Sequence, residues 1–184
     1  MLIDNNDSFT YNLKHYVEQF ASDVVVYRSA DIKLGSIDQF DKIILSPGPG
    51  LPNEHPVLKQ VLARYYIKKP ILGICLGQQA IAEFFNANLE NLTTVKHGVT
   101  SIVKHFKNCK LFKDIPENFK IGHYHSWVVS KNNFPDELTI TSENEEGIIT
   151  SLKHKKYDIT AVQFHPESIL TDHGMQLIKN WVLA

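Results

Sequence analysis

The sequence predicts one mixed α/β domain with an open, mainly parallel sheet flanked by helices. Short aliphatic runs alternate with segments of helical period along the first half of the chain. These runs are apolar at consecutive rather than alternate positions, which is typical of parallel strands buried on both faces. The length of 184 residues and the 43% hydrophobic composition fit one globular domain. We therefore expect a single domain, residues 1–184, without a repeat or a linker.

Four strands are expected in the first half of the chain, at residues 2–3, 24–27, 42–45 and 70–74. Helices are expected between or after them, at residues 9–20, 57–67 and 79–84. The first helix places Phe9, Leu13 and Val17 on one apolar face. Asp7 or Ser8 is its expected N-cap, because a short side-chain oxygen can accept from an unpaired amide of the first turn.

The second half of the chain shows shorter strands with fewer helices between them. The expected strands lie at residues 99–103, 138–141, 148–152 and 159–164. Residues 143–147 form a turn between two of them, in which Gly147 supplies a permissive backbone. A last helix, residues 174–183, carries Leu177, Ile178 and Trp181 on its apolar face.

Composition excludes several classes of protein. The net charge is -1, from 19 Lys and Arg against 20 Asp and Glu, so the basic excess of a nucleic-acid binder is missing. Two cysteines are too few for a disulfide framework. No apolar stretch approaches the ~20 residues that cross a bilayer, and the first residues do not resemble a signal peptide. We expect a cytoplasmic protein that binds neither membrane nor nucleic acid.

The strongest local signal is the segment 73–77, Gly-Ile-Cys-Leu-Gly, between an aliphatic strand and a helical stretch. It has the form of a nucleophile elbow in which cysteine replaces serine. The glycines permit a sharp turn, and the positive end of the following helix favours the reactive thiolate. The amide of Leu76 is free to donate to a developing oxyanion. The alternative is that Cys75 is a buried apolar residue, as we expect for Cys109.

A base for this thiol is predicted at His165, at the end of the strand 159–164. A histidine there can take the thiol proton and later deliver it to a leaving amine. Glu167 can accept from the other ring nitrogen and hold the imidazole in the useful tautomer. Most of the nine histidines must have no chemical role. His123 and His125 would share one side of a strand, but no further cysteine or carboxylate has the spacing of a metal site.

A third candidate is the loop 46–52, Ser-Pro-Gly-Pro-Gly-Leu-Pro, after the third strand. It is either a rigid turn or part of a binding crevice, since loops at the carboxyl ends of parallel strands form the ligand site of open sheets. Glycines there allow a substrate to approach the backbone closely. The amide of Gly48 or Gly50 is a candidate second oxyanion donor, whereas Pro49 has no amide hydrogen.

Several segments together resemble one known family. They are Ser-Pro-Gly-Pro-Gly at 46–50, Gly-Ile-Cys-Leu-Gly-Gln-Gln at 73–79, Gln-Phe-His-Pro-Glu-Ser at 163–168, the stretch 4–13, His-Gly at 97–98, Tyr-His-Ser-Trp at 124–127 and the stretch 168–174. In this order they resemble the class I, triad-type glutamine amidotransferases. They are similar to the glutaminase subunit, component II, of anthranilate synthase and of 4-amino-4-deoxychorismate synthase. The resemblance covers essentially the whole chain and implies a flavodoxin-like sheet.

The resemblance also implies roles for individual residues. It makes Cys75, His165 and Glu167 the catalytic triad. It implies that the glutamine site is lined by Gly48, Pro49, Gly50 and Leu76, and that Gln79 and the backbone at Ser126 and Trp127 hold the amino-acid end. The chain departs from the usual pattern at Gln78, at residues 86–87 and at Trp127.

The activity implied is hydrolysis of glutamine to glutamate and ammonia through a cysteine thioester. The ammonia passes to a separate chorismate-binding synthase subunit, component I, which makes anthranilate or 4-amino-4-deoxychorismate. No metal or organic cofactor is expected on this chain, and magnesium is expected only on the partner. The alternatives are a stand-alone cysteine hydrolase acting on a peptide or γ-glutamyl bond, a non-catalytic binding domain on the same fold, and a flavodoxin-like electron carrier.

Overall fold

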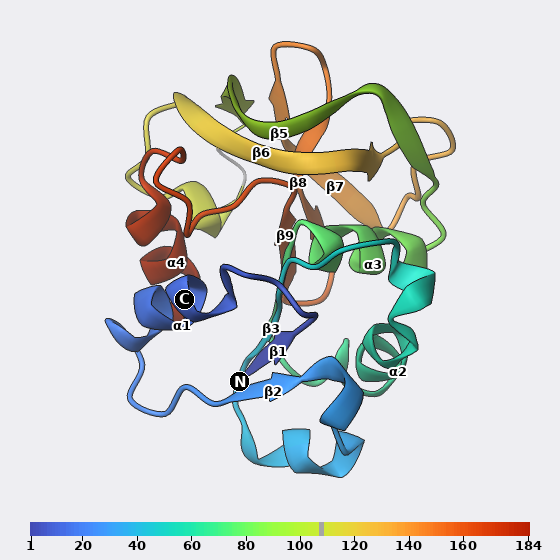
Figure 1. The fold of residues 1–184 in the computed structure, drawn as a ribbon, viewed down its shortest axis with the longest axis vertical. Coiled ribbons are helices and arrows are strands. Elements are labelled where there is room, and N and C mark those ends of the chain that lie inside the picture. The colour runs from blue at the N-terminus through green and yellow to red at the C-terminus, as the bar shows by residue number, and fades with distance from the viewer. Residues whose placement is uncertain (107–108) are drawn as a thin grey trace.

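The computed structural model describes residues 1–106 and 109–184, which form one sheet with helices on both faces (Figure 1). The strands are β1 (Leu2–Asp4), β2 (Val26–Arg28), β3 (Ile43–Leu45), β4 (Ile71–Ile74), β5 (Leu89–His105), β6 (Asn118–Val129), β7 (Leu138–Asn144), β8 (Ile149–His154) and β9 (Ile159–Val162). The helices are α1 (Thr10–Glu18), α2 (Pro56–Tyr65), α3 (Leu76–Phe84) and α4 (Gly174–Val182). Short 3₁₀ helices are η1 (Ser29–Asp31), η2 (Leu34–Gln39), η3 (Pro52–Glu54) and η4 (Lys110–Phe112).

The sheet has a parallel part and an antiparallel part. Its strand order is β2-β1-β3-β4-β9-β8-β7-β5-β6, and the first five strands are parallel. The other four continue the sheet with antiparallel pairs. The long strands β5 and β6 lie across the top of the molecule in Figure 1. The predicted fold class, a mixed and mainly parallel sheet flanked by helices, is confirmed.

Two hydrophobic cores explain why the parallel strands have continuous aliphatic sequences. Ile3, Leu45 and Ile71 face α2 and α3 in one core. Leu2 and Ile44, on the opposite face, pack against α1 and α4 in the other core. Figure 1 shows the two pairs of helices on opposite sides of the sheet. Since successive strand residues point to opposite faces, both must be apolar where both faces are covered.

Three features differ from the expectations. β5 begins at Leu89 instead of residue 99, and most of β6 was not predicted. The early part of β5 is largely exposed and its pairing with β6 is interrupted by two register shifts, so it lacks the regular alternation of a strand. β2 begins two residues later than expected.

The expected N-cap of the first helix was wrong. α1 begins at Thr10 after Phe9, and no side chain caps that position. The Asp7 carboxylate instead accepts from the amide of Phe9, the N-cap residue itself, at 2.8 Å, rather than from the amide of the second or third helical residue. Asp4 also holds this turn, because its Oδ1 accepts from the Thr10 hydroxyl at 2.8 Å and from the Asp7 amide at 3.2 Å.

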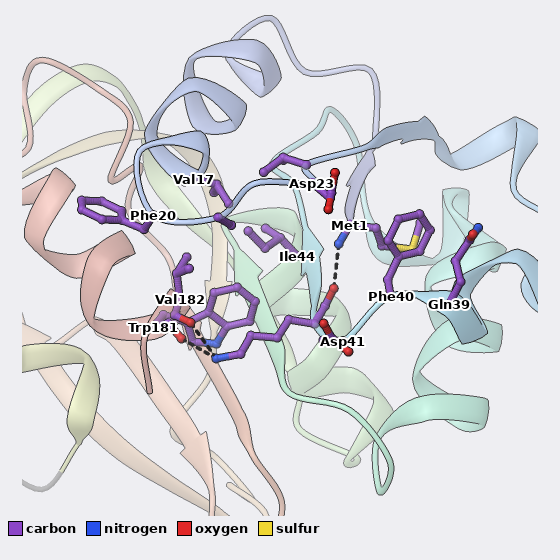
Figure 2. A pocket seen from close by; sticks show the side chains of 13 residues that line it. Met1, Val17, Phe20, Asp23, Gln39, Phe40, Asp41, Ile44, Trp181 and Val182 are labelled. Carbon is purple, nitrogen blue, oxygen red and sulfur yellow. Dashed lines mark hydrogen bonds between the residues drawn. The ribbon is translucent and has the colours of Figure 1, made fainter.

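A cavity of about 480 Å³ lies at the amino ends of the parallel strands, between β3, α1 and α4 (Figure 2). Lys42 Nζ donates to the carbonyl oxygens of Trp181 at 3.1 Å and Val182 at 2.9 Å, at the end of α4. These bonds tie α4 to the start of β3. The candidate catalytic residues lie at the opposite edge, after the carboxyl ends of β3, β4 and β9.

No helix in the two described ranges is both long and apolar enough to span a bilayer.

Candidate active site

The predicted site residues come from segments that follow three neighbouring parallel strands. Cys75 directly follows β4, the loop 46–50 follows β3, and His165 lies three residues after β9. β4 pairs with both β3 and β9, so these segments leave the sheet at the same edge. This is the position at which open α/β sheets bind their ligands.

Cys75 occupies a sharp turn between β4 and α3. Its backbone has φ +52° and ψ -103°, a region that side chains rarely adopt, and the residue is buried. The flanking glycines are required by space. A Cβ at Gly73 would lie 2.5 Å from the carbonyl oxygen of Gly77, and one at Gly77 would lie 2.4 Å from that of Leu45. The glycine–x–cysteine–x–glycine pattern therefore lets α3 start against the backbone of β3 and β4.

The amino terminus of α3 supplies donors beside the thiol. The first bond of the helix runs from the Gln79 amide to the Cys75 carbonyl at 3.1 Å. The amides of the preceding turn, including that of Leu76, have no intrahelical acceptor. This end of the helix also stabilises negative charge that develops beside it.

His165 and Glu167 form a buried pair. The Nδ1 atom of His165 lies 2.8 Å from Oε1 of Glu167, and both side chains are almost wholly inaccessible to solvent. The Tyr124 ring lies 5.0 Å from the His165 ring between centroids, in an edge-on arrangement. Nε2 of His165 has no hydrogen-bond partner among the described residues. The ring is therefore oriented by Glu167 and Tyr124 and keeps one nitrogen available.

The electrostatic surroundings favour a protonated His165. Burial by itself lowers the pKa of this imidazole, but the neighbouring Cys75 sulfur and Glu167 carboxylate raise the pKa well above its ordinary value. The charged imidazole is favoured when a negative group lies beside it. The geometry thus places a protonated imidazole beside the sulfur, so the proton for a leaving group is already on the histidine.

A cavity of about 170 Å³ opens beside the thiol. It is lined by Gly48, Pro49, Gly50, Cys75, Leu76, Gln79, Val95, His97, Tyr124, His125, Ser126 and Trp127. This set includes Cys75 and all seven residues expected at the glutamine site. His165 and Glu167 do not line the cavity and are buried.

The loop 46–50 is fixed against the loop after β1. The Asn5 amide donates to the Ser46 hydroxyl at 2.9 Å, and Asn5 Nδ2 donates to the Ser46 carbonyl at 3.0 Å. A Cβ at Gly48 would lie 2.6 Å from the Asn5 carbonyl oxygen, so this position has no room for a side chain. These contacts hold the Gly-Pro-Gly segment at one wall of the cavity.

Gln79 is one of the residues that line the cavity. Its Nε2 donates to the Trp127 carbonyl at 2.9 Å and to Gln163 Oε1 at 3.2 Å. Both amide hydrogens are therefore used, which leaves the carbonyl oxygen of Gln79 as the end that can accept from a ligand.

Sequence reasoning assigned no role to Val95, His97, Tyr124, His125 or Gln163. Four of them line the cavity, and Gln163 Nε2 lies 3.4 Å from Cys75 Sγ. All except Val95 fall in segments that carry the family resemblance, so the resemblance could have identified them as site residues. Val95 is an exposed residue of the irregular part of β5, and no pattern indicated it.

The two histidines of β6 contact each other. Nδ1 of His123 lies 2.9 Å from Nε2 of His125, and Nε2 of His123 lies 2.6 Å from the Ser101 hydroxyl. Burial lowers the pKa of His123 to about 4 and that of His125 to about 3, so both are neutral at pH 7. Within residues 1–106 and 109–184, no group of three or more His, Cys, Asp or Glu side chains is placed to hold a metal ion.

Cys109 lies in a different setting from Cys75. It is half-buried before η4, and burial raises the pKa of its thiol. A raised pKa disfavours the reactive thiolate at neutral pH. This agrees with the expectation that Cys109 serves packing.

Comparison with known proteins identifies the family of the chain. A family described as "Glutamine amidotransferase class-I" matches residues 1–184. The chain is 40% identical over 185 residues to anthranilate synthase component 2 of Pyropia yezoensis, covering 99% of this chain and 97% of that one. It is 38% identical over 184 residues to aminodeoxychorismate synthase component 2 of Escherichia coli K12, covering 99% and 98%. A glutamine amidotransferase of Thermotoga maritima shares the fold, with a TM-score of 0.69, 16% identity, and coverage of 90% and 74%.

The family match thus spans the whole chain, and the fold places the cysteine, histidine and glutamate segments at one edge of one sheet. The chain belongs to the class-I glutamine amidotransferase family.

Proposed function

We propose that this chain is the glutaminase component of a two-subunit synthase. It hydrolyses glutamine to glutamate and ammonia and supplies the ammonia to a chorismate-using subunit that makes anthranilate or 4-amino-4-deoxychorismate. The observation that carries the proposal is Cys75 in its elbow, at the wall of a cavity, beside the buried His165–Glu167 pair. The names of the relatives point to the two synthases.

In the first half-reaction, the Cys75 thiolate attacks the side-chain amide carbon of glutamine. Negative charge develops on the amide oxygen, where the Leu76 amide and one amide of the 48–50 loop donate to it. Each such donor is worth about 3 kcal/mol in comparable sites. His165 gives its proton to the amide nitrogen, the carbon–nitrogen bond breaks, and ammonia leaves. A thioester on Cys75 remains.

In the second half-reaction, neutral His165 takes a proton from a water molecule as the water oxygen attacks the thioester. The carbon–sulfur bond breaks, glutamate leaves, and the thiolate–imidazolium pair is restored. Glu167 accepts from Nδ1 of the ring throughout, which keeps Nε2 as the atom that exchanges the proton.

We assign the amino-acid end of glutamine to Gln79, Ser126 and Trp127, which line the cavity. The free carbonyl oxygen of Gln79 is suited to accept from the substrate ammonium group, since its amide nitrogen is bound to Trp127 and Gln163. Ser126 and Trp127 also line the cavity, and we assign their backbone to the carboxylate. Hydrolysis needs no metal or organic cofactor in this scheme, and we assign magnesium to the partner alone.

We place the partner over the mouth of this cavity. Ammonia that leaves Cys75 must reach the second subunit before it is lost to solvent. Val95, on the cavity wall, is 65% exposed, and Val99 on the same strand is also exposed. Ile169, two residues after Glu167, is 95% exposed. Large apolar side chains presented to solvent beside a functional cavity are typical of an interaction surface.

The test is a Cys75→Ala variant assayed with the chorismate-using subunit. We expect glutamine-dependent formation of the aromatic amine to be abolished and formation from added ammonium to be retained. Cys109→Ala is the matched control and should keep both activities. Glutamine-dependent turnover in the Cys75→Ala variant would refute the proposal.

A further inference from the structure

Gln163 is a fully buried residue that touches the nucleophile, and no step of the proposed mechanism uses it. It directly follows β9, two residues before His165. Its Nε2 donates to Cys75 Sγ at 3.4 Å, and its Oε1 accepts from Gln79 Nε2 at 3.2 Å. Both ends of one carboxamide are therefore engaged within the candidate site.

The orientation of this carboxamide follows from its neighbours. A backbone carbonyl can only accept, so the end of Gln79 that lies 2.9 Å from the Trp127 carbonyl is its amide nitrogen. That same nitrogen faces Gln163, which must present its carbonyl oxygen to it. The nitrogen of Gln163 is then the group directed at the Cys75 sulfur.

The backbone fixes both partners of this contact. The Cys75 amide donates to the Val162 carbonyl at 2.8 Å, and the Gln163 amide donates to the Thr150 carbonyl at 2.9 Å. The contact between sulfur and carboxamide therefore joins two segments that are each held by the sheet. Neither backbone segment can move easily to compensate when the Gln163 side chain is changed.

We propose that Gln163 is a positioning residue, which orients the Cys75 sulfur and favours its thiolate through an N–H···S hydrogen bond. Through Gln79 it also joins the sulfur to the Trp127 side of the glutamine pocket. The catalytic role of Gln163 rests on the proposed function. The hydrogen bonds that link Trp127, Gln79, Gln163 and Cys75 are present in the protein without substrate or partner.

The chemistry of an amide suits this role. A hydrogen bond to an ionised acceptor is stronger than one to the neutral form, so an N–H donor beside sulfur favours the thiolate. A carboxamide does not titrate in the working pH range, so it does not compete with His165 for the proton. His165 remains the acid and base, while Gln163 holds the sulfur in place.

The experiment measures alkylation of Cys75 by iodoacetamide as a function of pH, in the full-length chain carrying Cys109→Ala. Gln163→Met removes the donor and keeps a side chain of similar length. We expect the midpoint of its pH–rate profile to move to higher pH and its rate at pH 7 to fall roughly 10- to 100-fold, the effect of losing one hydrogen bond to a charged group. Gln78→Met is the matched control.

Gln78 is a suitable control because it is equally buried and lies on the same helix as Gln79. Both polar atoms of its side chain are without a hydrogen-bond partner among the described residues. Its replacement by methionine removes no bond, so the alkylation profile should stay that of the parent protein.

A second variant separates the donor from packing and covers the case in which Gln163→Met does not fold. Gln163→Glu keeps the length of the side chain and an acceptor for Gln79, but it replaces the donor by a carboxylate beside the sulfur. We expect a larger shift to higher pH than with methionine. A folded variant of either kind with the parent pH profile would overturn the proposal.

This readout is independent of turnover. If the wild-type protein hydrolysed no glutamine with its partner, the proposed function would fail, and the alkylation profile would still test the N–H···S contact.

Discussion

Gly174 limits the position of the segment that carries His165 and Glu167. It is the first residue of α4 and does not have a positive φ, so space rather than backbone conformation requires glycine there. A Cβ at Gly174 would lie 1.8 Å from the carbonyl oxygen of Pro166 and 2.9 Å from its carbonyl carbon. Pro166 separates His165 from Glu167, and its backbone cannot yield as a flexible side chain would.

We expect Gly174→Ala to reduce glutaminase activity about 100-fold. Real Cβ atoms stay about 3 Å or more from such an oxygen, so α4 or Pro166 must move by about 1 Å. A displacement of 1 Å at a catalytic group costs on the order of 100-fold in rate. Overpacking of this kind should also lower the free energy of unfolding by about 1–3 kcal/mol.

The assay is ammonia release from glutamine with the partner subunit present, together with urea denaturation of the isolated chain. Gly35→Ala is the control, because nothing lies within 4 Å of a Cβ there and the residue does not have a positive φ. It should keep full activity and stability. If Gly174→Ala stayed within threefold of the wild-type rate with an unchanged urea midpoint, the steric argument would be wrong.

Three further predictions concern stability and assembly. Lys42→Met should lower the free energy of unfolding by about 1–3 kcal/mol in urea denaturation, because α4 loses two charge-assisted hydrogen bonds, and an unchanged midpoint would contradict this. Burial lowers the folded-state pKa of His123 to about 4, so only the unfolded chain gains a proton there between about pH 6.5 and pH 4. Acidification from pH 7 to pH 5 should therefore lower the free energy of unfolding by about 2 kcal/mol through this residue. The His123→Gln variant should lack that part of the pH dependence. Ile169→Asp should weaken binding of the chorismate-using subunit at least about tenfold in calorimetry, whereas Ile67→Asp, exposed before β4 at the opposite edge of the sheet, should bind normally.

The parallel half of the fold was predictable because burial on both faces leaves a plain signal. Residues 43–45 are all buried, so the strand has three aliphatic residues in succession. The segment 89–98 has no such constraint. Val95 is exposed there, and register shifts interrupt the alternation by which a half-buried strand is identified. Its course is set by pairing with β6, which is an interaction distant in sequence.

The site was predictable to the extent that its chemistry is local. The elbow at Cys75 and the pair His165–Glu167 each lie within a few residues of sequence. The cavity is not local, since Tyr124 and His125 reach it from β6, a strand that packs there through its pairing with β5. Those positions were matched only through the family resemblance, and spacing alone gave them no role.

Strand register explains how these separate segments make one site. β4 pairs with β9 so that Ile74 lies opposite Val162, and the Cys75 amide continues this pairing with a bond to the Val162 carbonyl. That bond helps to hold the strained backbone of Cys75, a conformation that costs about 1–3 kcal/mol. It also puts the next residue, Gln163, beside the sulfur. A register slip of one residue would bring Val162 or Phe164 to this position, and neither side chain has an N–H donor. The register that stabilises the sheet is therefore also what assembles the nucleophile with its neighbours.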